Sequence, residues 1–306
     1  MKSVVVILVN WNRPQDTLKC IRSLELSDYP SFTTVVVDNG SADNSIALLK
    51  QVARIVLIEA GNNLGFTGGN NLGIKYALEK NTDFVLLLNN DTLIASDALS
   101  KMVAVAESDK NIGIVTPKIL FHPRHDLIWA AGTKYYGWCM TSRLTGYKEK
   151  DIGQHNRERD IAWATGCAML IKKEVLNNIG LLNDKIFAVG EDLDYGMRAI
   201  KHGDQIRYVP GAVVWHKESA SSGGHDAPQY VYYQTRNLVI FQRHWAGNLF
   251  HLAIAQAVAI LHFGKRIFLL SCRGKWRSIL GLLYGWRDGC FNRMGKQEYS
   301  VLKKSS

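Results

Sequence analysis

Two amides and a carboxylate directly follow a short apolar stretch near residue 90. Phe84–Leu88 is entirely apolar, which is typical of a buried strand, and Asn89, Asn90 and Asp91 come next. Ligands of open parallel sheets bind beyond the carboxyl ends of the strands, so these side chains are expected at a ligand site. The same residue types also favour turns and helix caps, and this stretch alone does not separate the two interpretations.

Three further polar clusters follow strand-like runs, and a parallel sheet would bring all four to one edge. They are Asn10-Trp11-Asn12-Arg13, Asp38-Asn39-Gly40-Ser41 and the glycine- and asparagine-rich stretch 62–71. Glycine and short amides let a backbone approach a nucleotide closely. The phosphate fingerprints G-x-G-x-x-G after the first strand and G-x-x-x-x-G-K-[ST] are both missing, which argues against a dinucleotide dehydrogenase and a P-loop ATPase. A metal bound by Asp91 is therefore the expected means of neutralising phosphate charge.

A second acidic group lies at residues 190–194, Gly-Glu-Asp-Leu-Asp. Adjacent carboxylates at the start of a helix disfavour one another's ionisation, so one of them can have a pKa raised toward that of a general base. The alternative is that the acids stabilise a helix N-terminus, with Arg198 as the partner of Asp194. His216, which follows the strand-like Ala212–Trp215, is either a metal ligand or a packed side chain.

The elements that must position these groups alternate cleanly over the first hundred residues. Helices are predicted from Pro14, from about Asn44 and after the loop at 61–70. Strands are predicted at Val4–Val9, Thr34–Val37, Ile55–Ile58 and Phe84–Leu88. This alternation predicts an α/β fold with a mostly parallel sheet, flanking helices and right-handed crossovers, a Rossmann-like nucleotide-binding half.

From residue 96 the pattern is mixed, and residues 135–160 are expected to form a long loop or an irregular hairpin. Helices are predicted at Ser96–Glu107, Lys173–Ile179 and Asp192–His202, the last stopped by Gly203. Strands are predicted at Ile112–Phe121, Leu127–Thr133, Ile161–Ile171, Ile206–Val209 and Ala212–Trp215. We expect a catalytic domain at 1–230, with a nucleotide-binding half at 1–110 and an acceptor and catalytic half at 111–230, and a helical segment at 231–306.

Composition is ordinary for a globular protein, with 47% hydrophobic and 21% charged residues. Five widely spaced cysteines without a Cys-x-x-Cys pair fit a reducing cytosol, and the apolar run at 4–9 is too short for a signal peptide. The expected location is therefore cytoplasmic.

The net charge of +10 comes from the C-terminal quarter. Residues 1–120 carry 11 Lys and Arg against 12 Asp and Glu, residues 121–230 carry 14 against 13, and residues 231–306 carry 12 against 2. Such a block of positive charge indicates an anionic binding partner, either a membrane surface or nucleic acid. The default interpretation is a charged face that is exposed to solvent and binds no partner. No recognised nucleic-acid module accompanies the charge, so no nucleic-acid partner is expected.

The C-terminal quarter also contains the apolar stretch Leu249–Leu270. His251, Gln256, His262 and the basic residues at 265–266 interrupt it, so it falls short of the run of about 20 apolar residues that spans a bilayer. Apolar and basic residues alternate as in helices that lie on membranes. We therefore expect a peripheral position at the inner face of the cell membrane, with packing of these helices on the catalytic domain as the alternative.

Seven motifs together resemble the family 2 glycosyltransferases, and most of all the bacterial rhamnosyltransferase-like branch that builds cell-surface polysaccharides. They are Val-Asn-Trp-Asn-Arg at 9–13, Val-Val-Asp-Asn-Gly-Ser at 36–41, Asn-Leu-Gly-Phe-Thr-Gly-Gly-Asn-Asn at 63–71, Leu-Leu-Asn-Asn-Asp-Thr at 87–92, Ala-Thr-Gly-Cys-Ala-Met-Leu-Ile at 164–171, Gly-Glu-Asp-Leu-Asp-Tyr at 190–195 and Tyr-Tyr-Gln-Thr-Arg-Asn at 232–237. Each motif is weak by itself, but the ordered set is specific.

The resemblance implies a GT-A fold and an inverting, Mg²⁺- or Mn²⁺-dependent transfer of a sugar, with rhamnose as the guess. The donor would be a nucleoside diphosphate (dTDP or UDP) sugar, and the acceptor a glycan or a lipid-linked saccharide. By position, Asp192 would be the catalytic base beside Glu191, and Asp91 and His216 would hold the metal. Asn89 stands where the family's Asp-x-Asp motif has its first acid, so Asp91 is the carboxylate expected to bind the metal.

The remaining site residues fall into two groups. The nucleotide-sugar side is expected to include Asn10, Asn12, Arg13, Asp38, Asn63, Gly65, Asn71, Asn89 and Asn90. The acceptor side is expected to include Trp163, Thr165, Gly166 and Arg236. Two other functions stay open: a nucleotidyltransferase acting on sugar phosphates, which would need more basic residues near Arg13, and a non-catalytic nucleotide-sugar-binding module.

Overall fold

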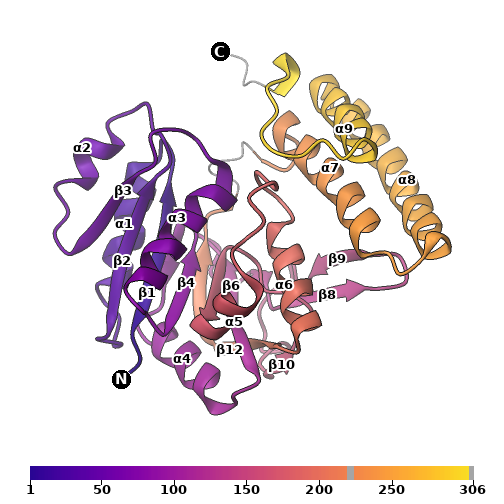
Figure 1. Ribbon diagram of the computed structural model, residues 1–306. Coiled ribbons are helices and arrows are strands. Elements are labelled where there is room, and N and C mark those ends of the chain that lie inside the picture. Colours follow the sequence, from indigo (N-terminus) through magenta and orange to yellow (C-terminus); the bar gives the residue numbers. More distant parts are fainter. Residues whose placement is uncertain (219–223, 303–306) are drawn as a thin grey trace. The chain divides into compact units, whose positions relative to one another are not determined.

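The computed structural model describes residues 1–218 and 224–302, which form two compact units (Figure 1). The first unit consists of Met1–Lys134, Arg143–Asn183 and Glu191–Glu218. The second consists of Tyr135–Ser142, Asp184–Gly190 and the described residues from 224 onward. The helical segment predicted from residue 231 lies in this second unit, together with two short segments from within the predicted catalytic domain.

A ten-stranded sheet forms the centre of the first unit. Its parallel half has the order β4-β1-β2-β3 and is made by β1 (Val4–Asn10), β2 (Phe32–Asp38), β3 (Ile55–Glu59) and β4 (Phe84–Leu88). The connecting helices are α1 (Pro14–Leu24), α2 (Ser45–Leu49) and α3 (Gly65–Glu79). The prediction of parallel strands with helical crossovers is confirmed here. Pro14 is the first residue of α1, where its fixed φ suits a helix start.

Beyond β4 the sheet is mixed. β11 (Ala168–Lys172) lies antiparallel between β4 and β6 (Ile112–Phe121), and β12 (Gln205–His216) runs parallel to β6. The other elements are β5 (Thr92–Ile94), β7 (Ile128–Ala130), β10 (Arg159–Asp160), α4 (Ala98–Ser108), α5 (Lys173–Ile179), α6 (Glu191–His202) and the two-stranded sheet of β8 (Thr133–Tyr136) and β9 (Thr141–Leu144).

Several of the predicted strands are wrong in extent, including the one predicted at Leu127–Thr133, where β7 covers only Ile128–Ala130. β12 is one strand where two were predicted, and its pairing with β6 shifts register between Val209 and Val213. β11 begins only at Ala168, although a strand was predicted from Ile161. Residues 161–168 are nonetheless mostly buried, so their apolar character reflects packing rather than strand pairing.

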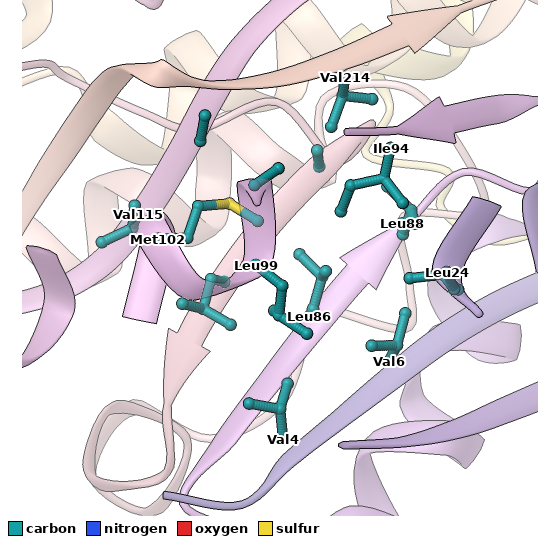
Figure 2. Packing of buried hydrophobic residues seen from close by; sticks show 14 of the residues in the cluster. Val4, Val6, Leu24, Leu86, Leu88, Ile94, Leu99, Met102, Val115 and Val214 are labelled. Carbon is teal, nitrogen blue, oxygen red and sulfur yellow. The ribbon is translucent and has the colours of Figure 1, made fainter. Parts of the chain in front are cut away.

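The two faces of the sheet have separate cores, and alternate residues of β1 point into each. Val4, Val6 and Leu8 belong to the core that also takes in side chains of α1 and α4. Figure 2 shows this core, with Leu99 and Met102 of α4 over the strand residues. Val5 and Ile7 belong to the other core, which takes in α3, α5 and α6. A sheet covered on both faces explains why its strands are almost continuously apolar.

The second unit is helical and contains α7 (Pro228–Trp245), α8 (Leu249–Cys272), α9 (Trp276–Cys290) and the short 3₁₀ helix η1 (Ser300–Leu302). α9 packs closely on α7 because Gly281, Gly285 and Gly289 recur every four residues. A Cβ at any of them would lie 2.5–2.7 Å from an atom of α7, so larger residues would push the two helices apart.

α8 has an unusual surface for a helix in a folded unit. It has 24 residues, and within the described chain it is long and apolar enough to cross a membrane by length and composition. The expectation that this stretch falls short of a spanning helix is therefore wrong on those two criteria. Only Ala255, Ala259 and Leu270 are buried in α8, whereas Leu261 and Phe268 are 75% and 66% exposed. Most of its apolar surface is left uncovered in this unit.

Candidate active site

Polar side chains meet where β1, β2 and β4 end. The register pairs Asn10, the last residue of β1, with Asp38, the last residue of β2. β4 ends directly before residues 89–91. The amide of Asn90 donates to the hydroxyl of Thr17 (2.8 Å), which itself donates to the amide oxygen of Asn10 (2.7 Å). The predicted gathering of these clusters at one sheet edge is therefore confirmed for the three strands.

His216 reaches Asp91 because β5 pairs with β12. Thr92, which follows Asp91 and opens β5, is in register with His216, the last residue of β12. The imidazole Nε2 lies 3.2 Å from Oδ1 of Asp91 and 3.4 Å from the amide nitrogen of Asn89. The side chains of Asp91 and His216 are both buried. The structure thus brings together the two residues that were predicted to hold a metal.

Asp91 and His216 each favour the charged form of the other. Burial opposes ionisation of Asp91, but the hydrogen bond and the charge of His216 lower the pKa of this carboxyl. Burial also opposes protonation of His216, whereas Cys167 and Asp91 raise its pKa well above 6.5. Both side chains are good metal donors, and a cation bound between them would replace the interaction that they make with each other.

The donor set decides how well a divalent metal fits. Carboxylate oxygens suit Mg²⁺ and Mn²⁺, and neutral imidazole is the commonest nitrogen ligand. Across residues 1–218 and 224–302, no three His, Cys, Asp or Glu side chains gather as a metal site. Asp91 and His216 therefore fit a cation that takes its other ligands from a bound molecule and from water.

Asp192, the second residue of α6, is held by two backbone N–H groups. Its Oδ2 accepts a hydrogen bond from Gly166 (3.1 Å), and its Oδ1 accepts one from Leu193 (2.8 Å). Burial raises the pKa of Asp192 to about 6, and the two backbone bonds limit that increase. Such a carboxylate is ionised at neutral pH and still basic enough to take a proton from a reacting hydroxyl. The geometry and the pKa both suit a general base.

The turn at residues 165–167 is shaped to approach α6 and α3. A Cβ at Gly166 would lie 2.9 Å from the ring of Phe66 and 3.7 Å from the carboxylate of Glu191, so glycine is required there. Thr165 accepts the N–H of Cys167 and is buried. Thr165 and Gly166 therefore lie beside the candidate base, and their contact with an acceptor stays a prediction.

Trp163 and Arg236 are enclosed by protein. Trp163 is buried, and a Cβ added at Gly196 of α6 would lie 2.6 Å from its side chain. Arg236 belongs to the second unit, where it is fully buried and donates to the carbonyl of Gly295. Both were predicted on the acceptor side, and the contacts seen in the described chain are packing for Trp163 and hydrogen bonds within the second unit for Arg236. A contact of either with an acceptor stays a prediction.

Asp38 and Asn10 form a buried network that shapes the loop after β2. Asp38 is 1% exposed and accepts from the amide of Asn10 (2.8 Å), the hydroxyl of Ser41 (2.7 Å) and the N–H of Ser41 (3.0 Å). Its two oxygens already accept three hydrogen bonds, which leaves about one lone-pair site of this enclosed carboxylate for a ligand. A direct contact of Asp38 with a base or a ribose stays a prediction.

Asn39 is a site residue that the sequence analysis did not single out. Its amide nitrogen donates to the carbonyl of Gly65 (2.9 Å), and its amide oxygen accepts from Leu64 (3.0 Å). Asn63 accepts from the N–H of Gly65 (2.9 Å). Asn39 thus fixes the glycine-rich loop at the start of α3, and its position directly after Asp38 was the signal that could have identified it.

Asn12 and Asn71 also use their amides to hold backbone. Asn12 has a left-handed φ of 52° and accepts from the N–H of Ala42 (2.8 Å). Asn71 is buried and exchanges two hydrogen bonds with Leu182 (2.9 and 3.1 Å). Arg13 is the residue before α1. Asn71 therefore joins α3 to a distant loop, and its predicted contact with a nucleotide sugar stays a prediction.

Comparison with known proteins decides the family. A family model described as "Glycosyltransferase like family 2" matches residues 2–230. The chain belongs to this glycosyltransferase family. A hexosyltransferase of low-salt glycan biosynthesis, Agl10 from Haloferax volcanii, is 27% identical over 96% of this chain and 92% of its own length. The N-acetylglucosaminyl-diphospho-decaprenol L-rhamnosyltransferase of Mycobacterium tuberculosis is 24% identical over 71% of this chain and 77% of its own length.

Solved structures agree on the fold of this glycosyltransferase. A mannosyltransferase from Pyrobaculum calidifontis, solved with GDP-Man and Mn²⁺, aligns with a TM-score of 0.59 over 95% of this chain and 87% of its own. At 17% identity this likeness shows the fold alone. The predicted GT-A fold is confirmed. The glycosyltransferase therefore has a known scaffold, and its substrates have to be argued from its own residues.

Proposed function

We propose that the glycosyltransferase is an inverting, metal-dependent hexosyltransferase that uses Asp192 as its catalytic base. The observation that carries this proposal is the partly buried carboxylate of Asp192, which accepts from the N–H groups of Gly166 and Leu193 and has a pKa raised to about 6. An inverting transfer needs one base on the acceptor side and charge neutralisation on the diphosphate side. Asp192 supplies the first, and the Asp91–His216 pair fits the second.

Each group has one task in the proposed reaction. Asp192 accepts the proton of the acceptor hydroxyl while the oxygen of that hydroxyl bonds to the anomeric carbon of the donor. The bond from that carbon to the diphosphate oxygen breaks at the same time, and the nucleoside diphosphate leaves with the bonding electrons. Asp91 and His216 would hold Mg²⁺ or Mn²⁺, which when bound stabilises the negative charge of the leaving diphosphate.

The substrates proposed are a dTDP or UDP sugar, with rhamnose as the sugar, and a lipid-linked or polysaccharide acceptor. The names of the two relatives, a glycan hexosyltransferase and a rhamnosyltransferase acting on a diphospho-decaprenol saccharide, support this choice. Related hexoses differ by only a few contacts in a pocket, so the sugar has to be found by experiment.

We place the enzyme at the inner face of the cell membrane, with α8 lying on the membrane rather than crossing it. α8 is tied to the rest of its unit along its length. Gln242 of α7 bonds to the Ala255 carbonyl and to the side chain of Gln256, Leu270 lies in the core of the unit, and Arg273 pairs with Asp226. A spanning α8 would break these contacts. Docking by one exposed apolar face keeps them.

A panel of dTDP, UDP and GDP sugars, each with Mn²⁺, Mg²⁺ or EDTA, tests the proposed function. We expect one donor to release nucleoside diphosphate with a metal and not with EDTA, faster when a lipid-linked saccharide is added. Release of pyrophosphate from a sugar phosphate and a nucleoside triphosphate would instead indicate a nucleotidyltransferase. Thermal stabilisation by a nucleotide sugar without turnover would indicate a non-catalytic binding module.

A further inference from the structure

The segment Asp184–Gly190 leads directly into the helix that carries Asp192. It belongs to the helical unit, and Glu191 of α6 follows Gly190 by one peptide bond. Its last two residues have left-handed backbone conformations, with φ of 68° at Val189 and 97° at Gly190. Glycine adopts such a φ freely, but a β-branched valine does so only at a cost in free energy. Contacts must therefore hold Val189 in place.

Asn237 of α7 supplies those contacts. Its amide nitrogen donates to two consecutive carbonyls, Ala188 (2.8 Å) and Val189 (2.7 Å). Its amide oxygen accepts from Nε of Arg236 (2.9 Å). A guanidinium has only donors, so Arg236 fixes which end of the amide faces the segment. One buried carboxamide thus satisfies both carbonyls that precede Gly190.

Arg236 links both ends of the segment 184–190 through hydrogen bonds to Asn237 and Gly295. It is 0% exposed, its Nη1 donates to the carbonyl of Gly295 (2.6 Å), and its guanidinium lies 4.8 Å from the ring centre of Tyr233. The N–H of Gly295 donates to the carbonyl of Lys185 (2.7 Å) at the other end of the segment. In the described chain, Arg236 thus hydrogen-bonds a carbonyl and an amide rather than a carboxylate. Such a buried cation is costly, which indicates a specific role.

We infer that Asn237, oriented by Arg236, is a positioning residue for the catalytic base Asp192. Asn237 fixes the backbone at 188–189, the chain continues through Gly190, and Asp192 follows three residues after Val189. The coupling passes through the covalent backbone alone. This role also accounts for the Arg-Asn pair at the end of the motif at 232–237, which no step of the proposed chemistry uses. The inference rests on the proposed function of Asp192.

Asn237→Asp separates positioning from folding. The carboxylate keeps an oxygen for Arg236 and gains an ion pair with it, so the helical unit should stay folded. It loses both N–H donors and faces two carbonyl oxygens, so residues 188–190 should no longer be held. We expect kcat to fall at least tenfold while the KM for the donor changes less than twofold. Hydrogen exchange at the amides of 189–193 should become faster in the same variant.

Tyr299→Phe is the matched control. It also removes two partly buried hydrogen bonds from the second unit, those of the Tyr299 hydroxyl with Asp288 and Arg287, and it leaves the segment 184–190 untouched. We expect kcat and the exchange of 189–193 to stay at wild-type values. Wild-type kcat in Asn237→Asp, or an equal loss in Tyr299→Phe, would overturn the inference.

The hydrogen-exchange readout keeps this test independent of the proposed function. If Asp192→Asn turns over normally, the base assignment is wrong whatever Asn237 does. If Asp192→Asn is inactive and Asn237→Asp shows neither faster exchange nor slower turnover, the positioning role alone is wrong. Asn237→Ala, which also loses the bond to Arg236, should show the same loss of kcat with a lower unfolding temperature.

Discussion

The two units differ in which side chains they place unfavourably with respect to water. The first unit withdraws acidic side chains from water, and the second exposes large apolar side chains to it. In the first unit, the carboxylates of Asp91 and Asp192 are partly buried, and this burial opposes the ionisation of both. In the second unit, Leu261 and Phe268 of α8 and Trp276 of α9 are 75%, 66% and 65% exposed. Buried charge and exposed apolar surface both cost free energy, so each needs a reason. The first departure suits chemistry on a diphosphate sugar, and the second suits docking.

The largest expected effect on activity comes from replacing the carboxylate of Asp192 in the first unit. Asp192→Asn keeps an oxygen to accept from Gly166 but removes the base, so we expect kcat to fall by about 10²–10⁴-fold. Donor binding should persist, because only the chemical step needs the base. Rates of the wild type should fall about tenfold per pH unit below pH 6, since protonation of a group with a pKa of about 6 removes the base. Normal turnover in Asp192→Asn would sink the assignment.

The same substitution should change the stability of the fold more favourably at high pH than at low pH, although the amide has one oxygen for the two N–H groups that the carboxylate accepts from. The pKa of Asp192 is raised from 3.8 to about 6 in the folded chain, so ionisation destabilises the fold as pH rises through this range. At pH 4 the group is largely protonated when folded and little is lost. At pH 7.5 the full penalty applies, up to about 3 kcal/mol for such a shift, and Asp192→Asn removes it. Urea unfolding at both pH values measures the difference, and an equal gain at the two would contradict burial as the cause.

Substitutions of Asp91 and His216, the proposed metal ligands of the first unit, should have a smaller effect on activity. His216→Ala removes a donor that lies 3.2 Å from Asp91, so the Mn²⁺ concentration for half-maximal activity should rise roughly tenfold or more. Asp91→Asn should abolish metal-dependent stabilisation by the donor. His125→Ala is the control, because His125 lies against Trp215 rather than at Asp91. An unchanged metal titration with lower thermal stability in His216→Ala would show that His216 only packs.

Secondary structure was predictable from sequence where local chemistry decides it. β4 and β6 have the predicted bounds because β4 is an uninterrupted apolar run and β6 is mostly apolar, with a polar or loop-forming segment at the end of each. Gly203, with φ of 106°, ends α6 as predicted. The strand predicted at Ile161–Ile171 was too long, because Ile161 and Trp163 are buried in a loop. Burial makes a segment apolar whether or not it pairs as a strand.

The candidate site was predictable in its residues but not in its contacts. Asp91 and His216 meet through the register of β5 with β12, which no local pattern encodes. The bonds of Asn39 to the glycine-rich loop depend in the same way on the packing of α3 against β2. The burial of Arg236 and its bond to Gly295 could not be predicted from its motif either, and its predicted place on the acceptor side stays a prediction.

The exposed face of the second unit also differs from its sequence-based description. Seven basic residues, Lys265, Arg266, Arg273, Lys275, Arg277, Arg287 and Arg293, were expected to face anionic headgroups. Five of them are engaged within the unit: Arg266 and Arg273 pair with Asp226, Arg287 and Arg293 pair with Asp288, and Arg277 donates to the carbonyl of Ser300. Lys265 and Lys275 are exposed. Docking should therefore depend more on apolar side chains and less on salt than the charge count alone predicts.

The smallest expected effects test that surface. Wild-type protein should co-sediment with anionic liposomes at low salt and be partly released at high salt, with weaker binding to neutral liposomes. Phe268→Ser and Leu261→Ser each remove an exposed apolar side chain, so each should weaken binding about fivefold, the equivalent of roughly 1 kcal/mol. Ile152→Ser, at a side chain 78% exposed in the first unit, is the control and should bind as wild type.

If both α8 variants bind normally but sediment as smaller particles in solution, the face of α8 joins copies of the chain instead. If the wild type ignores anionic liposomes at low salt and stays monomeric, the exposed apolar surface of the second unit needs another occupant, and the proposed membrane location is wrong.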